Sequence, residues 1–136
     1  MPSDLDIAYA AGIFDGEGSM AAFIGGGKYR RSLTYCASVW QSQYDLLNWL
    51  QKHFDGGVYG RKGAGYGKNS RKVAGEWRIT GIKAAAFLRT IRPHLIVRAS
   101  DVDELLHIWD IRMDRDKLVT ALAARKERLS QKRNKL

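Results

Sequence analysis

Two carboxylates stand at the end of an apolar segment near the N-terminus. Residues 7–14 are apolar or small, and Asp15, Gly16, Glu17 and Gly18 follow directly. The segment has helical spacing, so both carboxylates are expected at a helix C-terminus, where the carbonyl dipoles repel an anion by about 0.3–1 kcal/mol. A carboxylate kept there needs a compensating partner, and a divalent cation is an obvious one. Glu17 is therefore the first candidate for chemistry.

A stripe of small residues runs along the same expected helix. Ala8, Gly12 and Gly16 are spaced four residues apart and so share one side of it. One interpretation is a helix packed within its own domain and ended by Gly16 and Gly18 as capping residues. The other is a helix that meets a copy of itself, which would bring two acidic ends together. In that case the dimer interface includes Ala8, Gly12, Asp15 and Gly16.

The rest of the chain must position these groups, and its patterning predicts two hairpins and several helices. The first helix is expected to begin near Asp4 or Asp6, which are good N-caps, and to end at Asp15. Arg92 and Pro93 should stop a later helix, because a residue before proline avoids helical angles. The expected strands are at about 19–25, 32–39, 58–62 and 76–80, and the other helices at about 44–54, 82–91, 100–113 and 116–131.

The second expected strand alternates clearly between apolar and small polar residues. Leu33, Tyr35, Ala37 and Val39 would share one face, and the residues between them the other. In the fourth strand Trp77 and Ile79 would point one way, and Glu76 and Arg78 the other. This pattern is typical of an antiparallel sheet with a core on one side and a solvated face on the other.

Composition favours a polyanionic partner. The 136 residues suit one domain, and 23 Lys and Arg against 14 Asp and Glu give a formal charge of +9. No signal peptide or membrane-spanning segment is apparent. Cys36 is alone, which excludes an internal disulfide and fits an intracellular, reducing compartment. His53, His94 and His107 are scattered and do not have zinc-ligand spacing. We expect neither a membrane nor a small-molecule substrate as partner.

Residues 10–18, AAGIFDGEG, resemble the nine-residue signature of the LAGLIDADG homing endonucleases. Gly12, Asp15 and Gly18 match the signature, and Glu17 replaces its final aspartate but keeps the carboxylate. The order of the expected elements through about residue 98 agrees with the resemblance. It implies an α+β protein with the αββαββα fold, in which a four-stranded antiparallel saddle sheet carries helices on one face. Residues 1–136 would form a single domain, with a core of about 4–100 and a basic helical C-terminal extension of about 101–136.

The same resemblance implies a homodimeric enzyme that makes a double-strand break in a long, palindromic or nearly palindromic DNA target. Glu17 of each subunit, with the backbone carbonyl of Gly16, would hold Mg²⁺ for phosphodiester hydrolysis. Gln41 would orient the water network around the metal. Arg98 would project toward the scissile phosphate, where a permanently charged guanidinium suits stabilisation of developing charge. The signature occurs once, so the second acidic helix end must come from another subunit.

The expected DNA contacts lie on the solvated faces and the connecting turns of the two hairpins. Strands can enter the major groove, where the base edges differ, while loop cations are better suited to phosphates. The candidates are Phe23, Lys28, Tyr29, Arg30, Arg31, Ser32, Thr34, Cys36 and Ser38 of the first hairpin, and Lys62, Lys68, Asn69, Arg71, Lys72, Glu76 and Arg78 of the second.

Two other functions remain open. One is a non-cleaving protein on the same scaffold, either a DNA-binding regulator or an RNA-binding intron maturase, since fold does not fix activity. The other is a ribosome-associated or structural RNA-binding protein, which would explain the positive charge and the basic tail. The carboxylate at Glu17 favours cleavage, because a protein that only binds has no need of it.

Overall fold

The computed structural model describes residues 1–26, 32–62 and 73–134. Its elements, in chain order, are α1 (Asp4–Glu17), β1 (Gly18–Gly25), β2 (Ser32–Gln41), α2 (Tyr44–Phe54), β3 (Gly57–Lys62), β4 (Val73–Thr80), α3 (Gly81–Ile91), the 3-10 turn η1 (Arg92–His94), α4 (Ala99–Ile111) and α5 (Arg115–Asn134). The four strands form one antiparallel sheet in the order β1-β2-β4-β3. The predicted α+β, αββαββα architecture with C-terminal helices is confirmed.

Helix α1 differs from its prediction at both ends. Its N-cap is Ser3, whose Oγ accepts a hydrogen bond from the Asp6 amide at 3.1 Å, while Asp6 Oδ2 accepts one from the Ser3 amide at 3.0 Å. The expected caps Asp4 and Asp6 lie inside the first turn, because this reciprocal capping box satisfies two backbone donors at once. The helix also continues past Asp15 to Glu17.

Gly18, and not Gly16, ends α1. Its backbone is extended, with φ −77° and ψ 151°, and its N–H donates to the carbonyl of Phe14. A Cβ atom at Gly18 would overlap the ring of Phe14, which is fully buried. Glycine is therefore needed there for close packing beneath the joint between α1 and β1, and the chain passes from helix to strand without a loop.

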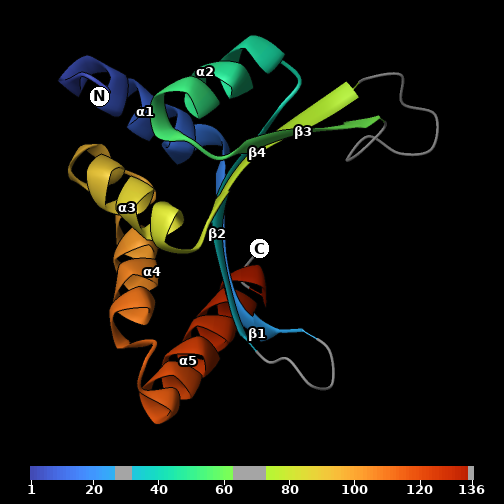
Figure 1. Ribbon diagram of the computed structural model, residues 1–136. Helices are drawn as coiled ribbons and strands as arrows, with labels where there is room; N and C mark the ends of the chain where they lie inside the picture. The colour runs from blue at the N-terminus through green and yellow to red at the C-terminus, as the bar shows by residue number, and fades with distance from the viewer. Residues whose placement is uncertain (27–31, 63–72, 135–136) are drawn as a thin grey trace.

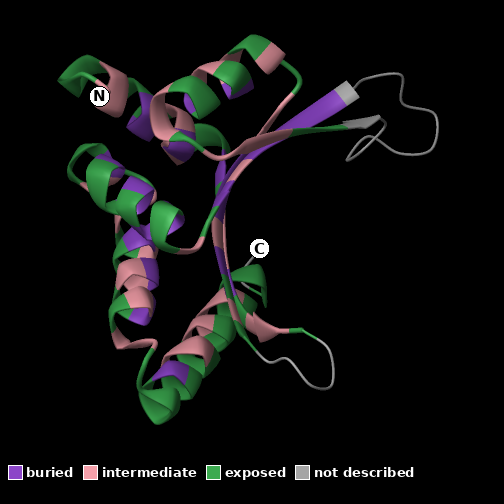
Figure 2. Cartoon of the chain, in the orientation of Figure 1, coloured by how far each residue is buried: buried purple, intermediate pink, exposed green. Residues whose placement is uncertain are grey.

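The sheet has the two predicted faces. Its register pairs Ala22 with Tyr35, and Val39 with Trp77, so these residues share one face. All four are buried, and α1, α2, α3 and α4 lie on this side of the sheet (Figure 1). Figure 2 shows the buried residues concentrated in the central strands and on the helix sides that face them. The core therefore lies between the sheet and its helices.

Aromatic side chains form the centre of this core. The Phe87 ring of α3 packs nearly edge-on against Phe14 at 5.8 Å, Phe54 at 5.4 Å and Trp77 at 4.9 Å between centroids. Trp77 is fully buried, and its Nε1 donates to the carbonyl of Asp55 at 2.8 Å. Burial of the ring therefore leaves no unpaired polar atom at the indole nitrogen.

Helix α3 ends at Ile91 as predicted, but the reason given for its end is wrong. Arg92 precedes Pro93 and still has helical angles, φ −49° and ψ −45°. The chain continues as the 3-10 turn η1, and Arg92 forms an ion pair with Asp103 of α4. Proline lacks the amide hydrogen that a further α-helical turn would need, which accounts for the change of helix type.

Among the described residues, none of the helices combines the length and the apolar character needed to span a membrane.

The carboxylate at the end of helix α1 and the open face of the sheet

Asp15 and Glu17 have different environments. The Asp15 carboxylate accepts backbone hydrogen bonds from Ile96 at 2.9 Å, Val97 at 3.1 Å and Arg98 at 2.9 Å. These amides immediately precede α4, where backbone N–H groups and the helix dipole favour an anion. The chain itself thus provides the partner that a carboxylate at the end of α1 requires, and for Asp15 that partner is not a metal ion.

Glu17 is the last residue of α1 and is exposed. The next residue, Gly18, donates its N–H to Phe14, so the helix ends with carbonyls of its last turn, including that of Gly16, beyond the ladder of helical hydrogen bonds. Gly16 is exposed as well. A carboxylate and carbonyl oxygens at one helix end are the hard oxygen ligands that Mg²⁺ prefers. No group of three metal-binding side chains gathers within the described parts of the chain.

Arg98 is brought to the same region by the bonds that Asp15 accepts. Its backbone amide lies 2.9 Å from Asp15 Oδ1, and Asp15 is two residues before Glu17. Its side chain is about one-third exposed, and Nη1 lies 3.9 Å from Oδ2 of Asp101 on α4. The structure therefore places the backbone of Arg98 beside the end of α1 while its guanidinium leans toward α4.

Gln41 is the last residue of β2 and is half-buried. Since Gly18 pairs with Val39, Gln41 lies two residues further along β2, toward the end of α1. Its Oε1 accepts a hydrogen bond from the Ser42 amide at 2.9 Å. By alternation Gln41 belongs to the side of the strand that the helices cover, unlike its neighbour Trp40.

The other face of the sheet is called the open face here. The register of the four strands defines its members. They include Ser19, Ala21 and Phe23 of β1, Ser32, Thr34, Cys36, Ser38 and Trp40 of β2, Tyr59 of β3, and Glu76, Arg78 and Thr80 of β4.

The open face contains the predicted contacts Phe23, Ser32, Thr34, Cys36 and Ser38. Phe23 is 52% exposed, whereas Ser38 is almost covered. Burial raises the pKa of the Cys36 thiol, with Arg78 opposing the shift and Glu76 adding to it. The sequence prediction of these alternating positions therefore agrees with the register.

Five of the members named above were not among the predicted contacts. They are Ser19, Ala21, Trp40, Tyr59 and Thr80. Strict alternation from Thr34 and Cys36 would have found Trp40, and alternation from Glu76 would have found Thr80. Tyr59, which is 53% exposed, is fixed by its pairing with Glu76, and no pattern within the short β3 indicates that pairing.

Glu76 and Arg78 have different accessibility on the open face. Glu76 is only 2% exposed, and its Oε2 accepts a hydrogen bond from Arg78 Nη2 at 2.9 Å. Arg78 keeps 41% of its side chain exposed. The two predicted contacts thus form one unit, in which Arg78 is the accessible part.

The side chains of the remaining predicted contacts are not described. The structure pairs the backbone of Lys62 with Val73 at the end of β3, and its side chain is not described. The other members of this group are Lys28, Tyr29, Arg30, Arg31, Lys68, Asn69, Arg71 and Lys72.

The small-residue stripe of α1 faces outward. Ala8, Gly12 and Gly16 are exposed, and a Cβ atom built at either glycine would meet nothing within 4 Å. Leu5 on the same helix is 83% exposed. Packing within the chain therefore does not explain these small residues. Asp15, the fourth predicted interface residue, uses its carboxylate within its own chain as described above.

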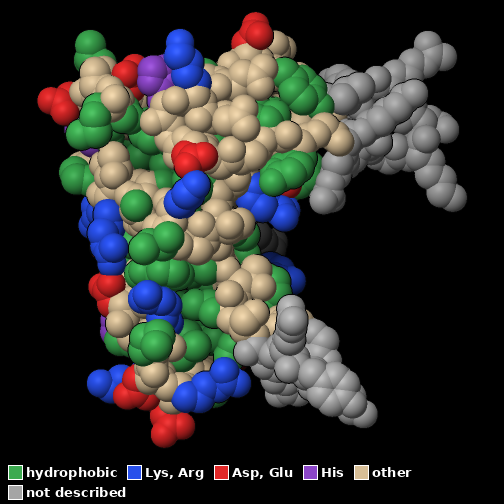
Figure 3. All heavy atoms as spheres, in the orientation of Figure 1, with side chains coloured by type: hydrophobic (Ala, Val, Ile, Leu, Met, Phe, Trp, Pro, Cys, Tyr) green, Lys and Arg blue, Asp and Glu red, His purple; other side chains and the backbone are tan. Residues whose placement is uncertain are grey.

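Helix α5 is mostly exposed (Figure 2), and it joins the domain through the buried Leu118 and through ion pairs. Arg128 Nη2 lies 2.7 Å from Oε1 of Glu104 and 3.2 Å from Oδ1 of Asp101, both on α4. Arg125 Nε lies 3.4 Å from Oε1 of Glu104. From Arg115 to the C-terminus the sequence has eight Lys and Arg against two acidic residues. Figure 3 shows Lys and Arg side chains in several separate patches on the visible surface.

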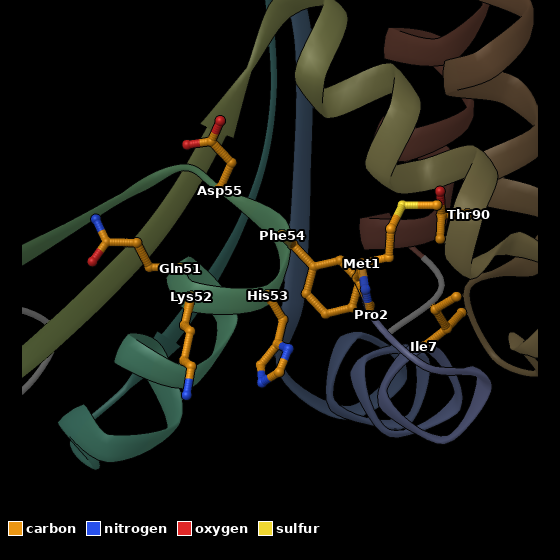
Figure 4. A pocket seen from close by; sticks show the side chains of 9 residues that line it. All are labelled: Met1, Pro2, Ile7, Gln51, Lys52, His53, Phe54, Asp55 and Thr90. Carbon is orange, nitrogen blue, oxygen red and sulfur yellow. The ribbon is translucent and has the colours of Figure 1, made fainter.

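A hollow of about 690 Å³ lies on the helix side of the molecule, away from the open face (Figure 4). Its lining includes Ile7, His53, Phe54 and Thr90, and His53 Nδ1 lies 3.8 Å from Oδ2 of Asp6. Ile7 is ten residues before Glu17, or about 15 Å along the helix. This hollow is therefore separate from the carboxylate at the end of α1.

The sequence matches no model of a known protein family and no curated protein sequence. The fold, in contrast, is shared with solved homing endonucleases. The structure of I-CvuI in complex with its target has a TM-score of 0.66 and 21% identity, over 87% of this chain and 73% of that one. The archaeal intron-encoded homing endonuclease I-Vdi141I, complexed with DNA, also has a TM-score of 0.66, with 17% identity, 88% of this chain and 76% of that one.

A third structure is that of the LAGLIDADG homing endonuclease I-GzeII in complex with a DNA target. Its TM-score is 0.61 with 15% identity, and the match covers 85% of this chain but 40% of that one. The chain therefore has the fold of the LAGLIDADG homing endonucleases.

Proposed function

We propose that the protein is a site-specific DNA endonuclease that acts as a homodimer and requires Mg²⁺ or a similar divalent cation. The observation that carries the proposal is the exposed Glu17 carboxylate at the joint of α1 and β1. Asp15, two residues earlier, is occupied by backbone donors, whereas Glu17 projects from the same helix end toward solvent. A surface carboxylate at an unfavourable helix end is well suited to a cation.

The open face supports DNA as the ligand. It combines hydroxyls, aromatic rings and the cation of Arg78 on twisted strands, and strands of this kind can enter the major groove. The formal charge of +9 supports attraction to a polyanion. I-CvuI, I-Vdi141I and I-GzeII, which share the fold, were all solved in complex with DNA.

The exposed stripe of α1 supports a dimer. Small residues at Ala8, Gly12 and Gly16 would let two α1 helices approach closely, and Leu5 offers apolar area beside them. The chain covers 40% of I-GzeII, so that protein has room for a second unit of this size, whereas I-CvuI, covered to 73%, does not. A chain with one unit needs a second copy to present two Glu17 side chains. The twofold symmetry predicts a palindromic or nearly palindromic target.

Each chain contributes few groups to the chemistry. Glu17 and the carbonyl of Gly16 would hold the cation, and the scissile phosphates would complete its oxygen ligands. When bound, the cation supplies charge stabilisation and a lowered pKa for an attacking water. Gln41, at the end of β2 toward α1, would orient water there. Arg98, whose backbone Asp15 fixes, would stabilise charge that develops on the phosphate.

The test compares wild-type protein with Glu17→Gln, using a supercoiled plasmid library, Mg²⁺ and sequencing of the cut ends. We expect wild-type protein to cut at one recurrent sequence, and the variant to bind that sequence in Ca²⁺ without cutting it. Glu127→Gln is the matched control, because Glu127 is an exposed glutamate on α5. Cutting by Glu17→Gln at the wild-type rate would refute the assignment. Sequence-specific binding with no cutting by wild-type protein would instead indicate a regulator.

A further inference from the structure

Glu76 is a buried carboxylate on the open face, most of whose members are partly or fully exposed. It is 2% exposed, and the register places it between Trp40 of β2 and Tyr59 of β3. Removal of a carboxylate from water is costly unless another charge and hydrogen bonds compensate for it. A buried carboxylate is poorly placed to accept a hydrogen bond from a base. Its role is therefore to orient a neighbouring side chain.

The partner of Glu76 is Arg78, two residues along the same strand and on the same face. Arg78 Nη2 donates to Glu76 Oε2 at 2.9 Å. Within the described residues Arg78 Nε is buried without a hydrogen-bond partner, while 41% of the side chain is exposed. The end of the guanidinium, with Nη1 and the second hydrogen of Nη2, is therefore the part left for a ligand.

The neighbours of Arg78 leave room for that ligand. Ser38 pairs with it on β2, Gly57 pairs with it on β3, and Ser19 pairs with Ser38 on β1. Ser19, Ser38, Arg78 and Gly57 thus form a row across the sheet. Arg78 is the long side chain of this row, and the other three residues are small. Ser19 is two residues after Glu17, so this row lies near the end of the open face where α1 joins the sheet.

We infer that Arg78 determines specificity by binding the O6 and N7 edge of a guanine in the major groove, and that Glu76 is the positioning residue that aims it. This inference rests on the proposed function and deepens it. The ion pair restrains the fork of the guanidinium, and bidentate binding to guanine requires such a fixed fork. The buried negative charge also disfavours a phosphate at this point, which directs Arg78 to a base rather than to the backbone.

The position of Arg78 in the sheet also predicts where its guanine lies within the target. Because it lies near Glu17, the guanine is expected in the part of each half-site closest to the cut. The twofold symmetry of the proposed dimer requires the same guanine, on the opposite strand, in the other half-site. The sequence expectation that Glu76 itself contacts DNA is replaced by this indirect role.

The experiment selects binding sites from a random double-stranded DNA library in Ca²⁺, using full-length wild-type protein, Glu76→Gln, Arg78→Lys and Asp55→Asn. Asp55→Asn is the matched control, because it also turns an ion-paired carboxylate into an amide, but on an exposed loop where Asn tolerates the positive φ of 71°. Thermal unfolding of each variant checks that it is folded. Arg78→Lys keeps the charge and removes the fork, so it tests the inference even where Glu76→Gln folds poorly.

We expect Arg78→Lys to reduce the preference for guanine at one position per half-site by about 5- to 150-fold, the range for loss of one bidentate pair. Glu76→Gln should reduce the same preference by about tenfold at that position, and Asp55→Asn should leave it unchanged. The dependence of affinity on salt should stay nearly the same in all four proteins, because a base contact releases no counterion.

Three outcomes would overturn the inference. Unchanged base preference in Arg78→Lys and Glu76→Gln would exclude both roles while the proposed function stands, provided wild-type protein still cuts its selected site in Mg²⁺. A change at a different base pair in Glu76→Gln would mean that Glu76 reads a base itself. Failure of wild-type protein to select any sequence would refute the proposed function, and the inference with it.

Discussion

Loss of the Asp15 carboxylate should weaken both the fold and the proposed site. Asp15 Oδ2 accepts one backbone hydrogen bond, from Ile96, and Oδ1 accepts two, from Val97 and Arg98. Hydrogen bonds to charged groups contribute about 1.5–3 kcal/mol each. Asp15 is only half-buried, so we take about 1 kcal/mol for each bond and expect Asp15→Ala to cost about 3 kcal/mol.

Asp15→Asn gives a graded version of the same change. Its amide oxygen can replace Oδ1 and keep two bonds, while its NH₂ group would face the Ile96 amide, donor against donor. The expected cost is about 1–2 kcal/mol. For a domain of this size each kcal/mol lowers the unfolding midpoint by roughly 3–5 °C. The segment before α4 should loosen, and Arg98 with it, so cleavage should slow more than binding weakens.

The assay combines thermal unfolding, DNA binding in Ca²⁺ and cleavage in Mg²⁺ for the two variants and for Asp45→Asn. Asp45 is an exposed aspartate in the first turn of α2, and its loss should cost no more than about 0.5 kcal/mol. An Asp15→Ala protein that unfolds at the wild-type temperature would refute the reasoning. If that protein had also lost cleavage, Asp15 would act on the metal or the partner subunit and not on the segment before α4.

Further predictions concern α1 and the C-terminal tail. Gly12→Leu should convert the dimer to monomers by light scattering without loss of helix content, because a Cβ there meets nothing within the chain. Gly18→Ala should destabilise the chain by chemical denaturation through overlap with Phe14, and unchanged stability would refute that packing argument. Joint replacement of Lys132 and Arg133 by Gln should weaken binding to all sequences alike and reduce the salt slope by about 2, and altered base preference would contradict a phosphate role.

Local patterns in the sequence determined the elements and the faces of the sheet. Alternation in β2 placed Tyr35 and Val39 in the core and Thr34 on the open face, because side chains of a strand point to opposite sides in turn. Tyr44–Phe54 was predicted with its observed bounds, since its apolar residues recur with the helical period. The residues at the end of α1 were also found from the sequence, because carboxylates at that end of a helix conflict with its dipole.

Only the tertiary structure separated residues of the same type by role. Asp15 and Glu17 look alike in the sequence, yet Asp15 meets amides 81 to 83 residues away and Glu17 faces solvent. Likewise Glu76 was expected at the surface, and its burial depends on neighbours that β2 and β3 bring beside it. The partner of a charged side chain is set by contacts between distant segments. A local pattern shows which way a side chain points, and only the folded chain decides what it meets there.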